Sequence, residues 1–341
     1  MIVNPYSTTA LTLDLLSTGL ATVTLWQTAS LLLKGGERDD KVESLTRRED
    51  RLYLVFWLGA VFLLLRLLLW PFFYLVLQSF VPEVEGTMCI FGVRNLLPRL
   101  TKGLELIKPL LFFLGLVWLI LFRLERFARK GPGGRSMLVL LLICALIGLV
   151  ESAGSAVLWI RASAELAVSC CTTITDIPTR FTVWVPLALL GPQYTLPLWY
   201  IYFGLNTVVS LAAIRVWSLL QSGKEIGKIA LPLLAVVALV NGVISTLAFI
   251  EVIAPRLMEM PFHHCIYCLV ETLLDAPLIL ALFILGTFLL MAAAPVSRFA
   301  SAWATHSALR RTLNSLLLYG ALFLIGSMVM VGVHLVTDGI W

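Results

Sequence analysis

The sequence predicts an all-α polytopic membrane protein, and its composition, hydropathy and charge distribution lead to that prediction. Of 341 residues, 60% are hydrophobic and only 13% are charged, whereas soluble domains carry about 25% charged residues. The mean hydropathy is +0.95. Apolar runs of about 20 residues, the length that a helix needs to cross a bilayer, recur along the chain. The first run follows no basic segment and is interrupted by Asp14, so we expect it to stay as a helix rather than to act as a signal peptide.

We predict eight membrane-spanning helices in a single transmembrane domain over residues 1–341. The predicted spans are 9–33, 52–80, 104–122, 137–160, 197–217, 229–252, 269–296 and 313–336. The stretch 181–197 is also apolar, but it is short and is interrupted by Pro186, Gly191, Pro192 and Pro197. We expect a re-entrant or interfacial segment there rather than a ninth crossing.

Lysines and arginines are unequally divided between the two sides of the membrane. The side that carries the segments 35–51 and 123–136 holds 16 of them, and the opposite side holds 7, with Lys108 counted among those 7. The positive-inside rule places the richer side in the cytoplasm. Both termini and the loops 81–103, 161–196 and 253–268 are then extracytoplasmic, and we expect a bacterial inner membrane.

Five of the six cysteines fall in the three extracytoplasmic loops, each loop forming the outer turn of a predicted helical hairpin. Each turn places a soft or imidazole ligand directly before a cysteine, in Met88-Cys89, Cys170-Cys171 and His264-Cys265. This pattern suggests a threefold hairpin repeat, since internal repeats are common in membrane transporters. Chance similarity is the alternative, because the matched stretches are short. Disulfides within one chain cannot pair an odd number of outward cysteines.

The strongest local motif is the stretch 256–268, which combines thioether, imidazole and thiol groups. Together these are ligands for Cu(I) or Zn(II), and thioethers favour copper. Two cysteines three residues apart can face one ion on a helical turn or a tight loop. The predicted metal ligands are Met88, Cys89, Cys170, Cys171, Met258, Met260, His263, His264, Cys265 and Cys268.

Two other interpretations of these cysteines stay open. Cys265 and Cys268 form a Cys-x-x-Cys pair that could cycle between dithiol and disulfide, with His264 lowering the thiol pKa and a membrane quinone as electron acceptor. Alternatively, the loops are joined by structural disulfides in an oxidising compartment. The adjacent pair Cys170-Cys171 is poorly suited to a mutual disulfide, because disulfide geometry requires separated α-carbons.

Several charged residues fall inside predicted spans, where function is the default hypothesis because burial in lipid is costly. Cys268, Glu271 and Asp275 follow one another at i, i+3 and i+7, which places them on one stripe of a helix that Pro277 would kink. The two acids could accept protons or pass a cation inward, or Glu271 could simply meet water at headgroup depth. Deeper in the membrane, we expect Arg66 to pair with Glu151 or Asp14 and to join helices.

The chain resembles two groups of membrane proteins in its Cys-Cys and Cys-x-x-Cys motifs alone. These motifs make up a few per cent of the sequence. The two groups are the mercury and copper uptake proteins and the quinone-linked disulfide-forming enzymes, whose four-helix cores do not cover eight spans.

The leading hypothesis is a protein that binds copper, or else zinc, outside the cytoplasm, for transport or for transfer to a partner. We expect a binding protein rather than an enzyme. The alternatives are a quinone-linked thiol–disulfide oxidoreductase and a non-catalytic subunit of a membrane complex. Expected partners are the lipid bilayer, an extracytoplasmic metal or thiol carrier and other membrane subunits, but no nucleic acid.

Overall fold

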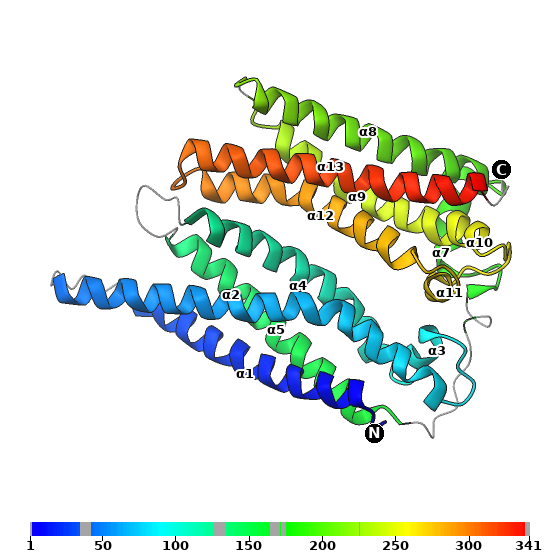
Figure 1. The fold of residues 1–341 in the computed structure, drawn as a ribbon, viewed down its shortest axis with the longest axis horizontal. Helices are drawn as coiled ribbons and strands as arrows, with labels where there is room; N and C mark the ends of the chain where they lie inside the picture. The colour runs from blue at the N-terminus through cyan, green and yellow to red at the C-terminus, as the bar shows by residue number, and fades with distance from the viewer. Residues whose placement is uncertain are drawn as a thin grey trace. The chain divides into compact units, whose positions relative to one another are not determined.

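The computed structural model describes residues 2–34, 42–125, 134–163, 171, 175–224 and 226–337, and these residues are helical apart from short connections (Figure 1). Eight helices in this described part are long and apolar enough to cross a membrane, which confirms the predicted fold class. The helices are α1 (Pro5–Lys34), α2 (Val42–Ser79), η1 (Val81–Glu83), α3 (Ile90–Arg94), α4 (Pro98–Glu125), α5 (Gly134–Arg161), α7 (Phe181–Leu190), α8 (Thr195–Gln221), α9 (Ala230–Ala248), η2 (Phe249–Ile253), α10 (Ala254–Leu257), α11 (Ile266–Thr272), α12 (Ala276–Ala300) and α13 (His306–Thr337).

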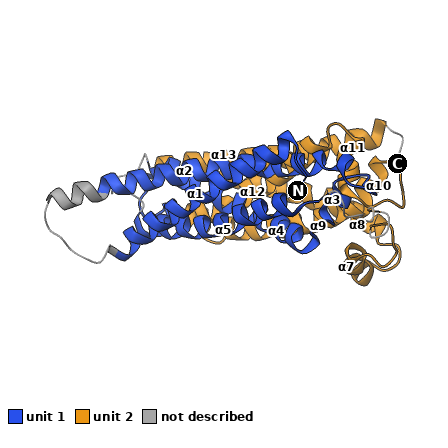
Figure 2. Cartoon of the chain, turned by 90° about the horizontal axis from the view of Figure 1, so that it is seen from below, with its two compact units in different colours: residues 1–168, 299–305 blue, residues 169–298, 306–341 orange. Residues whose placement is uncertain are grey.

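The chain forms two compact units (Figure 2). Unit 1 consists of residues 1–168 and 299–305, and unit 2 consists of residues 169–298 and 306–341. In unit 1, α1 packs on α5 and α2, and α4 packs on the same two helices. Four charged side chains, one from each of these helices, are buried between them: Asp14, Arg66, Lys108 and Glu151.

Lys108 was wrongly assigned to an outer loop in the charge count. The side chain lies within α4, is 5% exposed and pairs with Glu151 of α5. A single charge in an apolar run is easily misplaced, because a run of about 20 residues tolerates one charge when a neighbouring helix supplies its counterion. Without Lys108, the imbalance of basic residues between the two predicted sides becomes larger.

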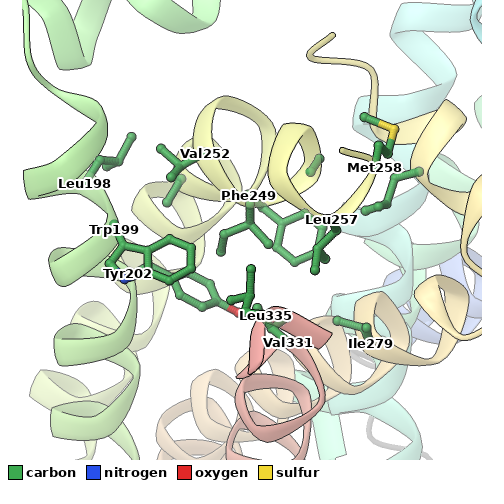
Figure 3. Packing of buried hydrophobic residues seen from close by; sticks show 14 of the residues in the cluster. Leu198, Trp199, Tyr202, Phe249, Val252, Leu257, Met258, Ile279, Val331 and Leu335 are labelled. Atoms are coloured by element: carbon green, nitrogen blue, oxygen red, sulfur yellow. The ribbon is translucent and has the colours of Figure 1, made fainter. Parts of the chain in front are cut away.

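Unit 2 has an apolar core where α8, η2, α10, α12 and α13 meet. Figure 3 shows its side chains facing one another, with Trp199 and Tyr202 of α8 opposite Phe249 and Val252 of η2. The short helix α11 packs on this core through Leu269, and Cys268 lies against its edge. Both views of the fold place α7, α10 and α11 at one end of unit 2 (Figures 1 and 2). We call this end the thiol end, because Cys265 is the N-cap residue of α11 and Cys268 lies within that helix.

The seventh predicted span, 269–296, is not one continuous helix. Helix α11 ends at Thr272, Leu273 is extended, and α12 begins at Ala276. In an unbroken helix the ring of Pro277 would collide with the carbonyl of Leu273, four residues before it. The predicted stripe is therefore interrupted: Cys268 and Glu271 share α11, and Asp275 lies beyond the break.

Helices α12 and α13 approach each other closely at two glycines. A Cβ atom on Gly286 would lie 2.9 Å from the backbone nitrogen of Leu324 and 3.0 Å from the carbonyl oxygen of Gly320. Small residues allow helix backbones to approach in this way. Helices in lipid gain nothing from the hydrophobic effect when they associate, so close van der Waals packing has to stabilise the pair. Ser327 also donates a hydrogen bond of 2.9 Å to the carbonyl of Ile279 across the same pair of helices.

We expect Gly286→Ala to destabilise the protein by about 1–3 kcal/mol, because the added methyl group meets backbone atoms that cannot move aside. Unfolding in detergent by heat or by SDS titration measures the change. Gly332→Ala is the matched control, since a Cβ atom at Gly332 of α13 meets nothing within 4 Å. Equal stability of Gly286→Ala and the unchanged protein would contradict this packing.

Candidate functional site

Three cysteines of unit 2 gather at its thiol end. The sulfur atoms of Cys171, Cys265 and Cys268 lie within 4.8 Å of one another, and the Cys171 and Cys268 sulfurs are 3.7 Å apart. Cys265 occupies the N-cap of α11 and Cys268 follows within its first turn, so the spacing of three places both on one side of the turn. All three are thiols, and Cys171 and Cys265 are each only 2% exposed.

His263 adds an imidazole to this set. Its Nε2 atom lies 3.8 Å from the Cys171 sulfur, and its Nδ1 atom lies 3.0 Å from both carboxylate oxygens of Asp176. An ionised carboxylate can only accept, which assigns the proton to Nδ1 and leaves the Nε2 lone pair available as a ligand. Histidines that bind metals are commonly held by a carboxylate in this way.

Asp176 is ionised in this arrangement. Burial acts to raise the pKa of its carboxyl, but hydrogen bonds from His263 and Thr175 outweigh that effect and hold the pKa below its usual range. Thr175 donates to Asp176 over 2.8 Å, so the carboxylate is fixed from both sides. No sequence signal singled out Asp176, because a lone acid in a loop lacks a diagnostic spacing.

His264 contacts the π-helix η2. Its Nδ1 atom donates to the carbonyl oxygen of Ile250 over 3.3 Å and is 3.9 Å from a carboxylate oxygen of Glu251. Burial lowers the pKa of His264, and the positive charge of Arg180 lowers it further. His264 was predicted as a ligand beside His263, but only His263 is directed at Cys171.

An ion pair fixes the segment that carries Cys171 and Asp176 to η2. Arg180 donates to the two carboxylate oxygens of Glu251 over 3.0 and 2.5 Å, a bidentate geometry that is strong and directional. Tyr194 donates to the same carboxylate over 2.9 Å. Burial and the negative charge of Glu251 raise the pKa of Tyr194 to about 12, so it remains a donor.

Two of the predicted thioether ligands, Met258 and Met260, belong to unit 2. Met258 is 7% exposed and packs in the apolar core of unit 2 (Figure 3), and Met260 is exposed. In unit 1, Met88 is exposed, while Cys89 is buried at the N-cap of α3. Cys170 lies outside the described residues.

The predicted inner acids also have defined positions. Glu271 is exposed on α11, and Asp275 accepts a hydrogen bond from His334 of α13 over 2.8 Å. In unit 1, Arg66 pairs with both Asp14 and Glu151, where the sequence predicted one pair or the other.

Fold and site together define a multi-pass helical membrane protein with a cluster of thiols and one carboxylate-held imidazole. Thiols that converge in this way, with an imidazole beside one of them, suit soft ions such as zinc and Cu(I). No protein-family model, curated protein or solved structure matches the chain.

We expect Asp176→Asn to weaken zinc binding about 10- to 100-fold, because an amide no longer fixes the Nδ1 proton or increases the basicity of Nε2. Competition between the purified protein and a chromogenic chelator measures this affinity. Asp275→Asn is the matched control, since it makes the same chemical change at a carboxylate that holds His334 instead. Equal zinc affinity of Asp176→Asn and the unchanged protein would count against the role of Asp176.

Proposed function

We propose that this membrane protein binds a soft metal ion at the thiol end of unit 2. The ligands would be the sulfurs of Cys171, Cys265 and Cys268 and Nε2 of His263, with Asp176 orienting the imidazole. The main support is the convergence of three thiols within 4.8 Å. Two of them come from one turn of α11 and the third lies 94 residues before Cys265 in the chain. A soft ion would gain from each deprotonated sulfur as it binds.

The donor set favours zinc or Cu(I) over hard cations, because no carboxylate oxygen lies among the proposed ligands. The thioethers that favoured copper in the sequence do not support it here, since Met258 packs in the apolar core. The remaining thiolates and imidazole match a zinc site of the Cys3His type. We therefore propose zinc as the principal ion and Cu(I) as its competitor.

Partial access to the ligands supports transfer of the ion rather than permanent retention. The side chains of His263 and Asp176 are 13% and 24% exposed, whereas Cys171 and Cys265 are buried. An incoming carrier could therefore reach the imidazole side of the site first. We propose that the ion is received from, or delivered to, an extracytoplasmic carrier.

Metal analysis of the purified protein tests the proposal. Under reducing conditions we expect about one zinc or copper ion per chain, and Cys265→Ser should abolish retention because a hydroxyl is a poor ligand for soft ions. Cys144→Ala is the matched control: Cys144 is a buried thiol on α5, and its removal should leave the metal content unchanged. Absence of bound metal in the unchanged protein after incubation with both ions would refute this function.

A second function is favoured by the 3.7 Å separation of the Cys171 and Cys268 sulfurs. A side-chain rotation could bring them to bonding distance, about 2.05 Å. Oxidation would join the two sulfurs and release two protons and two electrons, which a membrane quinone would accept as it becomes hydroquinone. The protein would then be a thiol–disulfide oxidoreductase.

Thiol alkylation followed by mass spectrometry separates the two functions. An oxidoreductase should lose two alkylatable thiols per chain when a quinone is added and regain them with a dithiol reductant. Cys268→Ser should abolish this change, whereas Cys144→Ala should not affect it. A thiol count that stays constant with quinone would leave metal binding as the function of the cluster.

A further inference from the structure

Unit 1 contains a group of four buried charged side chains that lie away from the helix ends. Asp14 of α1, Arg66 of α2, Lys108 of α4 and Glu151 of α5 are each 5% exposed or less. We call these four residues the charge quartet. One member comes from every long helix of unit 1, and together they carry two positive and two negative charges.

The quartet lies within the membrane-spanning helices, away from their ends. Lys108 is ten residues after the start of α4, and Glu151 is ten residues before the end of α5. At a rise of about 1.5 Å per residue, each is about 15 Å from the nearer end of its helix. Ionisable groups inside membrane spans commonly mark proton or ion pathways.

The contacts within the quartet join its members in a chain. Arg66 donates to one Asp14 oxygen over 2.7 Å, and Trp159 donates to the other over 2.8 Å. The Glu151 carboxylate pairs with both Arg66 and Lys108. Lys108 also lies 3.2 Å from the Ser155 hydroxyl.

The two cations differ in what they can do with a proton. Arginine stays protonated in proteins, whereas a buried lysine can release its proton. If the Lys108 ammonium transfers a proton to Glu151, both groups become neutral and the net charge of the quartet does not change. Transfer within this pair therefore avoids an uncompensated charge in lipid, which is the main cost of moving a proton through the membrane interior.

Two small cavities in unit 1 adjoin this pair. One is lined by Arg66, Lys108 and Glu151, and the other by Asp14, Lys108 and Trp159. Each offers about 10 Å³ to the centre of a water molecule, close to the room that one water needs. The Arg66 Nε atom, buried and without a hydrogen-bond partner among the described residues, could donate to a water in the first cavity. Lys108 lines both cavities.

We propose that the charge quartet is a proton relay through the middle of unit 1. The Lys108 N–H bond breaks as an O–H bond forms on Glu151. Glu151 then gives its proton to water in the cavity that it lines, which makes hydronium, and becomes a carboxylate again. The neutral amine of Lys108 takes a proton from hydronium in the cavity beside Asp14, which leaves water there. Each cycle moves one proton from one cavity to the other and restores the starting charges, with Arg66 holding Glu151 in place.

Proton uptake into vesicles that contain the purified protein tests the relay, with a membrane potential as driving force and an internal pH-sensitive dye as readout. Lys108→Arg is the decisive variant, because it keeps the positive charge of the quartet but cannot release a proton. We expect its proton flux to fall to that of protein-free vesicles. Lys102→Arg, at an exposed position of the same helix, should behave like the unchanged protein. Equal flux in Lys108→Arg and the unchanged protein would overturn the relay and leave the quartet a structural ion-pair network.

A measurement on the unchanged sequence guards against misfolding of the variants. Infrared difference spectra across a pH titration should contain a protonated-carboxyl band that shifts when the glutamates are labelled with carbon-13. Such a band, lost in Glu151→Gln, supports proton transfer to Glu151. Its absence at every pH would overturn the proposal whatever the variants show.

Discussion

The requirement that every buried charge have a partner shapes both units of this protein. In hydrocarbon a lone ion is costly, so a polar side chain persists only where neighbouring helices neutralise it. The charge quartet satisfies this condition with two acids and two bases from four helices. At the thiol end of unit 2 the same condition applies to Glu251, which is 2% exposed and held by Arg180 and Tyr194. These pairings determine which helices can be neighbours as well as where chemistry can occur.

The candidate site depends on this electrostatic framework. The pair Arg180–Glu251 fixes the segment before α7 to η2, and that segment carries Cys171 and Asp176. Helix α11 brings Cys265 and Cys268 to the same place through its apolar contact with the core. An apolar core and one ion pair thus position ligands that lie far apart in the sequence, and the site itself need contribute little to the stability of the unit.

Hydropathy alone predicted the eight long helices, because the bilayer imposes a length that few other structures require. The grouping of the cysteines also predicted the loops that carry the candidate site. Side-chain direction was not predictable: adjacent His263 and His264 have equivalent sequence signals, yet only one faces Cys171. Asp176 and Lys108 became important through contacts with residues more than 40 positions away, and no local pattern encodes such a contact. A kink at Pro277 was predicted, because its collision with an earlier carbonyl is a local effect, and the structure has a break between α11 and α12 there.

The π-helix at Phe249–Ile253 has a consequence for how this protein can change. A π-turn holds one residue more than an α-turn, and one residue corresponds to about 100° of helical rotation. The wide turn absorbs that extra residue locally, so the helix resumes α-helical winding in α10 without being turned about its axis. Glu251, whose carboxylate Arg180 and Tyr194 hold, lies within this turn. A change in η2 must therefore keep this carboxylate opposite Arg180, whatever it does to the apolar side chains around it.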